Sequence, residues 1–314
     1  MRPGYRRSET STTSGREGFI LVTVLMISTL LLSSAVSFAW FSRQEMRRAA
    51  AEEFALISRS LAQVALYTVS EWIGGDENAY DSELEIIYNP KIPLVLPFDD
   101  WYVIVNIVPQ DRLLSINDIF LPDGVTVRHE LEYPWEEIWS KLGNDDLKLL
   151  VLDFLDTNEE ARPGSKEEDY YVNRAISDLS ELLRLPDMTP PLLYQNPNEP
   201  RSTLDQYFTV YGGDKINVNL APREVLAVLD KDIGTDVADS IITYRNEAFI
   251  TSEKDLIKIP GFPVSATSRL KGILGYKSSY FLVELKVVHF ERERTFSVML
   301  SRSGNFCQIE HWRE

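Results

Sequence analysis

The chain has 314 residues, of which 44% are hydrophobic and 25% are charged, and its formal net charge is −16. This composition allows one or two folded units. So acidic a chain is a poor general nucleic-acid binder, because phosphate contact requires clustered lysines and arginines. The single cysteine, Cys307, excludes an intrachain disulfide, so a metal is one candidate for stapling the fold.

An apolar run lies close to the N-terminus. No charged side chain lies between Phe19 and Phe41. A bilayer core is crossed by about 20 apolar helical residues, so this run is long enough to span it. Arginines flank the run on both sides: Arg2, Arg6, Arg7 and Arg16 before it, and Arg43, Arg47 and Arg48 after it. Charge alone therefore gives only a weak indication of orientation.

Three interpretations of this run compete. A secretory signal cleaved near Ala39 is disfavoured, because such signals have an apolar core of only about 7–15 residues. A plain signal anchor explains the hydrophobicity and nothing more. The third interpretation uses the junction of Gly18 and Phe19. A small residue followed by Phe at the start of a long apolar helix resembles the class III leader of type IV pilins and type II secretion pseudopilins. That resemblance implies cytoplasmic cleavage after Gly18 by prepilin peptidase and N-methylation of Phe19.

Thr23 occupies the fifth position of the expected mature chain. Most members of these families carry Glu there, where it answers the terminal amine of a neighbouring subunit in an apolar bundle. A threonine cannot supply that charge. Among pseudopilins, the K-type minor pseudopilin typically lacks the Glu, so Thr23 is compatible with that type. The alternative is a tolerated polar residue in an ordinary anchor.

Residues 42–73 continue the helix. Apolar residues recur there at intervals of three and four and form one stripe: Met46, Ala50, Phe54, Ile57, Leu61, Val64, Thr68 and Trp72. Gly74 and Gly75 end the helix. A long helix, half in a membrane and half packed on a soluble body, is the layout of pilins. A membrane-proximal amphipathic helix of no special family remains the alternative.

The remaining chain is predicted to be α+β. Residues 76–100 are expected to be irregular, 101–108 to form a strand and 111–117 a second, short strand. Residues 280–288 and 294–302 are predicted to form a hairpin that turns near Glu291. A sheet built from both ends of the body implies an insertion between them. The insertion is expected to be mostly helical, with helices at 134–142, 145–155, 171–184, 222–230, 235–247, 252–258 and 264–274.

Three short blocks of the insertion, and a fourth just after it, carry a more specific resemblance. Residues 153–171, Asp-Phe-Leu-Asp-Thr-Asn and onward to Tyr-Tyr, resemble the Asp-Trp-Ile-Asp-x-Asp … Pro-Gly-Gly-Ala-Glu-x-x-Tyr-Tyr block of the general secretion pathway protein K family. Residues 179–190 are similar to its next block, 216–222 to its Ile-Asn-Val-Asn-Thr-Ala-Pro, and 279–281 to its return into the sheet. Departures from the family pattern occur at Phe154, Asn158 and Leu220.

This resemblance implies a pilin-like fold with a large, mostly helical insertion that contains a helix-hairpin-helix-like part. The expected segments are a leader at 1–18, the N-terminal helix at 19–75, a first sheet segment at 76–117, the insertion at 118–277 and a second sheet segment at 278–314. It also implies a single-pass inner-membrane protein with a cytoplasmic N-terminus and a periplasmic body. The expected partners are the I-type and J-type minor pseudopilins, prepilin peptidase and membrane lipid.

Calcium is the cofactor that the resemblance implies. The loop after residue 155 is rich in oxygen ligands, which hard cations such as Ca²⁺ prefer. Gly164 permits a turn that brings its two halves together. The expected ligands are Asp153, Asp156, Asn158, Glu167 and Asp169, although Asn158 could weaken the site. The residue types alone leave a solvated acidic loop, with Asp153 or Asp156 capping a turn, as an equal alternative.

The partner-binding residues expected from the resemblance lie along the helix: Thr23, Met46, Phe54, Ile57 and Leu61. Together with the large insertion, Thr23 favours a place at the tip of a pseudopilus, where no subunit is added above.

A rival function is DNA binding or uptake, because residues 217–261 resemble a helix-hairpin-helix module. Four carboxylates crowd its first hairpin: Asp230, Asp232, Asp236 and Asp239. They would repel a polyanion, and Pro263 removes an amide donor from the second hairpin. The module is therefore expected to pack on protein, burying Ile241, Ile242 and Leu256, with no nucleic acid bound.

Catalysis is the third possibility and the least favoured. Three histidines are scattered along the chain and lack a partnered nucleophile motif: His129, His289 and His311. Cys307 has no local catalytic signature. A hydrolytic carboxylate pair could be hidden in the acidic loop, but the expected assignment is a protein that is not an enzyme.

Overall fold

The computed structural model describes residues 14–89, 91–199 and 201–314, with side chains from Gly18 onward. Residues 1–13 of the predicted leader lie outside the described residues. The chain divides into two compact units, Met1–Ser60 and Leu61–Glu314. A single helix, α1 (Ser14–Gly74), supplies the described part of the first unit and the start of the second.

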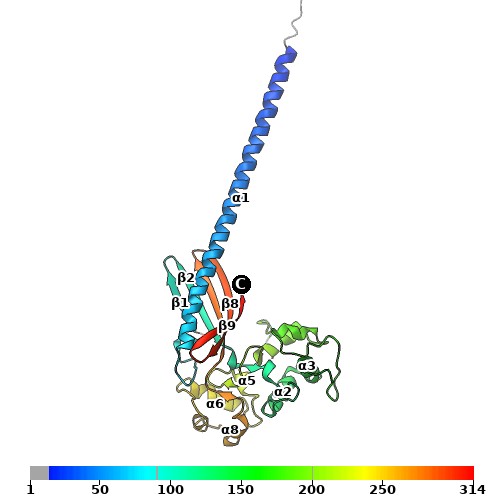
Figure 1. The fold of residues 1–314 in the computed structure, drawn as a ribbon, viewed down its shortest axis with the longest axis vertical. Helices are drawn as coiled ribbons and strands as arrows, with labels where there is room; N and C mark the ends of the chain where they lie inside the picture. Colours follow the sequence, from blue (N-terminus) through cyan, green and yellow to red (C-terminus); the bar gives the residue numbers. More distant parts are fainter. Residues whose placement is uncertain (1–13, 90, 200) are drawn as a thin grey trace, which may run out of the picture. The chain divides into compact units, whose positions relative to one another are not determined.

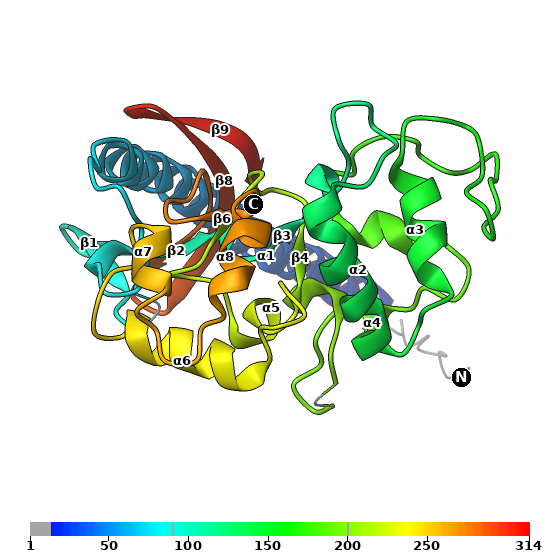
Figure 2. The same ribbon diagram turned by 90° about the horizontal axis from the view of Figure 1, so that it is seen from below.

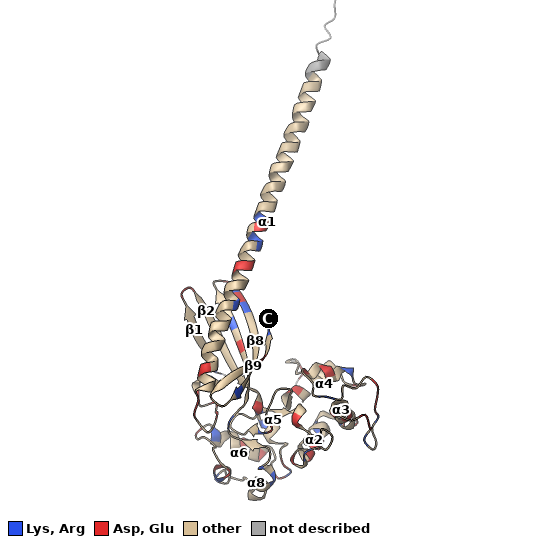
Figure 3. Cartoon of the chain, viewed as in Figure 1, with Lys and Arg blue, Asp and Glu red and all other residues tan. Residues whose placement is uncertain are grey.

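The N-terminal part of α1 is long and apolar enough to cross a membrane. Its most apolar window has a mean hydropathy of 2.4 and is 0% buried by other parts of the chain. Figure 3 shows no charged residue along this stretch; the first ones appear further down the helix. This single N-terminal apolar helix fits a single-pass membrane anchor.

The second unit contains a five-stranded antiparallel sheet (Figure 1). Its strands are β1 (Leu94–Phe98), β2 (Trp101–Pro109), β7 (Tyr280–His289), β8 (Arg292–Ser303) and β9 (Phe306–Arg313). They are hydrogen-bonded in the order β1-β2-β7-β8-β9, so the first two strands and the last three come from opposite ends of the body. The predicted α+β class, with an antiparallel sheet interrupted by an insertion, is confirmed.

Period-two alternation places one face of the sheet against α1. Val103, Val105 and Ile107 of β2 are at most 5% exposed. Alternate residues of β7 and β8 join them in one buried cluster: Phe281, Val283, Leu285, Val287, Phe296, Val298 and Leu300. The helix contributes Ala62, Ala65, Leu66, Val69 and Ile73 to the same cluster. The hydrophobic effect of this burial holds the last turns of α1, from Leu61 onward, on the sheet.

Two strands of the five-stranded sheet lie where the sequence predicted none. β1 falls in a stretch expected to be irregular because of Pro97; an edge strand tolerates proline, since one side needs no hydrogen-bonded partner. β9 forms the other edge and is mostly exposed, so it lacks the apolar alternation that marks a strand. The predicted hairpin is confirmed as β7 and β8. The short strand predicted within 111–117 is β3 (Leu114–Ser115), which pairs in parallel with β4 (Phe208–Thr209) outside the five-stranded sheet.

The insertion contains seven α-helices among its described residues: α2 (His129–Leu142), α3 (Leu147–Leu155), α4 (Pro190–Leu193), α5 (Arg223–Leu226), α6 (Thr235–Arg245), α7 (Glu253–Leu256) and α8 (Val264–Leu270). Most lie within the predicted ranges and are shorter than predicted. The prediction of a helix at 171–184 is wrong. Only Leu179–Arg184 is helical there, as a 3-10 turn, because Asn173 takes a left-handed backbone conformation with a φ of 46°.

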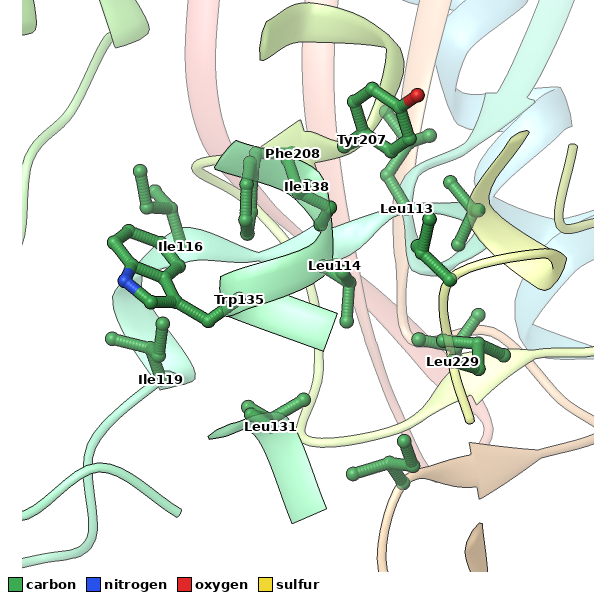
Figure 4. Close-up of a cluster of buried hydrophobic side chains, with 14 of the residues drawn as sticks. Leu113, Leu114, Ile116, Ile119, Leu131, Trp135, Ile138, Tyr207, Phe208 and Leu229 are labelled. Carbon is green, nitrogen blue, oxygen red and sulfur yellow. The ribbon is translucent and has the colours of Figure 1, made fainter. Parts of the chain in front are cut away.

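Two groups of helices make up the insertion, as Figure 2 shows: α2, α3 and α4 in one group, and α6, α7 and α8 in the other. A second two-stranded parallel pair, β5 (Ile216–Asn217) with β6 (Leu274–Gly275), closes the latter group. One hydrophobic core runs through both groups. Figure 4 shows part of it, where Trp135 and Ile138 of α2 lie near Phe208 of β4. The ring centroids of Trp135 and Phe208 are 5.4 Å apart.

Asp111 fastens the insertion to the sheet. Its buried carboxylate accepts hydrogen bonds from the backbone amides of Gly213, Ser279 and Tyr280, with distances of 2.7, 2.7 and 2.8 Å. Gly213 is required for this approach, because a Cβ there would lie 2.8 Å from Asp111 Oδ1. Burial raises the pKa of Asp111, and the three amide donors partly offset that rise. One side chain therefore joins the chain leaving the sheet to the chain returning to it.

Asp81 makes a second set of hydrogen bonds to the segment where the chain returns to the sheet. It is fully buried, and its Oδ2 accepts hydrogen bonds from the Ser278 amide and from Arg302 Nη2, the latter at 2.6 Å. Burial raises the pKa of Asp81, while Arg302 opposes the rise. The Asn217 amide group donates to the Asp81 carbonyl at 3.1 Å. The loop after α1, the insertion and β8 therefore meet at one polar cluster.

Removing the Asp111 carboxylate should destabilise the body strongly. An Asp111→Ala variant leaves three partly buried amides without their acceptor, so we expect the free energy of unfolding to fall by about 3 kcal/mol. Urea unfolding of the full chain in detergent, followed by intrinsic fluorescence, measures this. Asp214→Ala, an exposed aspartate beside Gly213, is the matched control and should change stability by less than about 0.5 kcal/mol. Equal midpoints for the two variants would contradict this role of Asp111.

Candidate functional site

The expected processing junction lies on α1. Gly18 and Phe19 are both exposed, and the Phe19 side chain retains 74% of its accessible surface. Thr23 Oγ1 donates to the Phe19 carbonyl at 2.9 Å, one helical turn back. The threonine hydroxyl is therefore satisfied within its own helix and offers no charge to a neighbouring subunit.

The stripe of α1 that is expected to bind partners lies on a different side of the helix from the residues that face the sheet. At 3.6 residues per turn, Leu61, Val64 and Trp72 lie roughly a third of a turn from the residues that face the sheet. Val64 is 51% exposed and Trp72 39% exposed, whereas Leu61 lies at the border and packs partly against the sheet core. In the first unit, Met46 is 67% exposed, and Phe54 and Ile57 are half-buried. An apolar flank of α1 thus remains uncovered beside the face that holds the body.

The acidic loop follows α3. Because the last residues of α3 are buried, the carboxylates at and just after its end are buried with them. Asp153 and Asp156 are fully buried. Arg162 bridges them: its Nη1 donates to Asp153 Oδ1 at 2.8 Å and also to Asp156 Oδ2. Its Nη2 donates to the Val125 carbonyl. Sequence reasoning assigned no role to Arg162, although an arginine within a run of carboxylates is the signal that could have revealed this pairing.

Glu167 and Asn173 lie together at the same loop. Asn173 Nδ2 donates to Glu167 Oε1 at 3.1 Å, and the Asn173 amide donates to the Phe154 carbonyl at 3.1 Å, which holds the segment at the end of α3. Three buried acceptor oxygens here have no hydrogen-bond donor: Asp156 Oδ1, Glu167 Oε2 and Asn173 Oδ1. Unsatisfied buried acceptors are costly, so each one calls for a partner such as water or a cation.

Electrostatics at this loop favour an added positive charge. Burial raises the pKa of Asp156, despite the opposing effect of Arg162. Burial also raises the pKa of Glu167, and the charges of Asp153, Asp156 and Glu159 raise it further. The carboxylates are therefore near enough to repel one another, and one guanidinium does not fully compensate them.

The other two expected ligands are placed less favourably. Asn158 Oδ1 accepts from the Glu160 amide at 2.6 Å, so it already stabilises a local turn. Asp169 is exposed. The structure thus brings Asp153, Asp156 and Glu167 to one region, adds Asn173 to them, and leaves Asp169 on the surface.

The donor chemistry of this loop fits a hard cation. Carboxylate and amide oxygens without donors are the ligands that Ca²⁺ takes. Within the described residues, however, no group of three His, Cys, Asp or Glu side chains is already gathered around a metal position. Arg162 holds two of the carboxylates instead, so a bound ion would share its ligands with that guanidinium.

The helix-hairpin-helix-like part buries its apolar side chains as expected. Ile241 and Leu256 are 1% and 0% exposed, while Ile242 is partly buried. The carboxylates of the first hairpin are not all free. Asp230 and Asp232 pair with Arg269, at 2.6 and 2.5 Å, and Asp239 pairs with Arg223 at 2.5 Å. The Arg269 hydrogen bond lowers the pKa of Asp230. Repulsion of a polyanion at this hairpin is therefore weaker than the sequence suggested.

The residues of the Ile-Asn-Val-Asn block act structurally. Asn219 is fully buried; its side chain donates to the Ile250 carbonyl at 2.8 Å and accepts from the Ile250 amide at 2.9 Å. The buried Arg245 donates to the carbonyls of Val218 and Ala221, at 3.0 and 2.6 Å. These bonds satisfy the backbone where the chain enters the helix pairs, and the sequence alone did not reveal them.

The histidines lie on separate elements. His129 begins α2, His289 ends β7 and His311 is on β9. His289 Nε2 lies 2.9 Å from Asp100 Oδ2, and its ring stacks on Trp101 at 4.0 Å. This pairing ties the end of β7 to the turn before β2. Cys307 is also on β9, partly buried against the sheet core.

Comparison with known proteins gives one informative result. No protein-family model matches the chain, and no curated protein sequence matches it significantly. Among solved structures, the chain is similar to a chain in the GspK-GspI-GspJ complex of the type 2 secretion system from enterotoxigenic Escherichia coli. The TM-score is 0.61 at 14% sequence identity, over 87% of this chain and 98% of that one. The expected likeness to a minor pseudopilin is therefore confirmed at the level of the fold.

Proposed function

We propose that this chain is a minor pseudopilin of a type II secretion system, of the K type. The observation that carries the proposal is the structural likeness to a chain of the GspK-GspI-GspJ complex over 87% of the sequence, a share too large to exclude the insertion. The Gly18–Phe19 junction and the apolar first half of α1 support the same assignment. Such a protein acts as a structural subunit and not as a catalyst.

A place at the tip of the pseudopilus follows from two features. Thr23 uses its hydroxyl within its own helix and carries no charge for the amine of a subunit above it. The insertion, from the end of β3 to the start of β7, enlarges the body far beyond the five-stranded sheet. A subunit with no neighbour above can carry such a body, and it would initiate assembly with the I-type and J-type partners.

The membrane arrangement follows from the same assignment. The apolar part of α1 would anchor the precursor in the inner membrane, among its lipids, with the leader in the cytoplasm and the body in the periplasm. Prepilin peptidase would cut after Gly18 and methylate Phe19. Exposure of both residues on the helix is compatible with access by that enzyme.

Partner helices would dock on the uncovered flank of α1, which Met46, Phe54, Ile57, Leu61 and Val64 follow. Thr23 would be a separate contact nearer the N-terminus, on another side of the helix. Val64 and Met46 retain more than half of their accessible surface, at 51% and 67%. Apolar side chains that no other part of the chain covers are typical of helix-to-helix interfaces.

Charge placed on this flank should weaken assembly. A Val64→Asp variant would bury an unpaired carboxylate at the interface, so we expect recovery of the I-type partner with the full chain to fall at least about tenfold. Co-purification from detergent extracts measures this. The adjacent Gln63→Asp is the matched control, because it adds the same charge to an exposed position on another side of the helix. Unchanged recovery with Val64→Asp would contradict the proposed interface.

Calcium is the cofactor that we propose for the acidic loop. Asp153, Asp156, Glu167 and Asn173 would hold it, with Asn158 and Asp169 as further candidate ligands. The three buried oxygens without donors support this proposal, because a cation would satisfy them together. Bound calcium would neutralise the loop and fix its two halves to the end of α3, so its contribution would be structural.

Thermal unfolding of the full chain with calcium or with chelator tests this. Calcium should raise the melting temperature, and Glu167→Gln should reduce the shift, while the exposed neighbour Glu168→Gln should leave it unchanged. Arg162→Gln should cost about 3–5 kcal/mol without calcium, because it leaves two buried carboxylates unpaired. Calcium should recover part of that loss. A melting temperature that does not respond to calcium in any of these variants would contradict the site.

A further inference from the structure

A lysine-lined cavity lies in the α6–α8 part of the insertion, away from the acidic loop and the helix flank. Its volume is about 550 Å³. Lys215 precedes β5, Lys254 lies in α7 and Lys271 follows α8, and all three line it. Gly275 of β6 lets Lys215 approach, because a Cβ at Gly275 would lie 3.1 Å from Lys215 Cβ and 3.7 Å from its Cδ. Segments far apart in the sequence thus gather three positive charges.

These charges are not neutralised within the described part of the chain. Residues 14–89, 91–199 and 201–314 offer no ion pair or hydrogen bond to the ammonium groups of Lys215, Lys254 or Lys271. By contrast, Lys258 pairs with Asp255 at 2.8 Å. Asp255 also accepts hydrogen bonds from the hydroxyls of Thr251 and Ser252, so both of its oxygens already have donors other than the cavity lysines. Glu253 is the one acidic side chain among the described lining residues.

The rest of the lining combines hydroxyl donors with apolar surface. Thr267 Oγ1 is buried and has no hydrogen-bond partner in the described structure. Leu256, Leu274 and Tyr276 also line the cavity and supply its apolar surface, although Leu256 itself is fully buried. A ligand that presents negative charge to the lysines and an apolar group to the leucines would satisfy both kinds of surface.

We propose that this cavity binds an acidic peptide segment of a partner protein, with glutamate or aspartate side chains on the lysines and one aliphatic side chain on the leucine walls. The inference is independent of the proposed function, since it rests on the cavity alone.

The physical chemistry favours a peptide over other anions. Lysine ammonium groups are point charges on flexible stems, so each can bind a separate carboxylate. The described lining residues include no arginine, whose guanidinium would bind one phosphate through two parallel hydrogen bonds. A flat anionic membrane or a nucleic-acid duplex would also meet the acidic remainder of a chain whose net charge is −16. A short segment avoids most of that repulsion, because charges more than about 8 Å away are screened at physiological ionic strength.

Binding of a labelled peptide to the full chain tests the proposal. The probe contains glutamates around one leucine, and its control peptide has glutamine at every glutamate. Fluorescence anisotropy would be measured in a neutral detergent at physiological salt and again at high salt. The variant carries Lys215→Gln, Lys254→Gln and Lys271→Gln together. The matched control carries Lys91→Gln, Arg184→Gln and Lys231→Gln, which removes the same charge from exposed or partly exposed positions outside the cavity.

We expect the glutamate probe to bind the unaltered chain, to weaken at high salt, and to lose at least about tenfold in affinity in the cavity variant while the control variant loses less than about twofold. Melting temperatures of the two variants establish that both are folded. Three results would overturn the proposal. The first is no binding of the glutamate probe, and the second is an equal loss of affinity in the two variants. The third is displacement of the probe by inorganic phosphate at the same concentration as free peptide, which would indicate a simple anion site.

Discussion

The return of the chain into the sheet at Ser278–Tyr280 is the contact on which the rest of the body depends. Two buried carboxylates, Asp81 and Asp111, accept hydrogen bonds from the backbone amides of this short segment. Asp111 also binds Gly213 inside the insertion. Because buried carboxylates without donors are unfavourable, these bonds fix where the insertion leaves and rejoins the sheet. A large helical part can therefore be added to a small sheet without separating β2 from β7.

The helix α1 presents three surfaces. One face, with Leu66 and Val69, is buried on the sheet and stabilises the body. Its neighbouring flank keeps Val64 exposed, and its first half is apolar enough for a bilayer. In the proposed function these three surfaces contact the body, the partner subunits and the membrane. The chain cannot form an intrachain disulfide. Buried polar clusters, such as those at Asp81 and Arg162, instead connect distant segments of the body.

The sequence predicted elements whose signal is local. The apolar run and the alternation in β7 identified α1 and the central hairpin, because periodicity reports burial directly. It did not predict β9, whose exposed residues carry no alternation, or the irregular path near Asn173, which long-range hydrogen bonds to Phe154 and Glu167 determine. The acidic loop was recognised from residue types. Its pairing with Arg162 was not, because that contact depends on how α3 buries Asp153 and Asp156.

The most direct test of the proposed function is the N-terminus of the protein extracted from membranes, determined by intact mass and terminal sequencing with and without prepilin peptidase. A pseudopilin is expected to give a mature chain that begins at N-methylated Phe19 and forms only when the peptidase is present. A chain that still begins at Met1 in the presence of the peptidase, or that begins after Ala39, would contradict it, and the protein would then be an ordinary anchored or exported protein with a pilin-like fold.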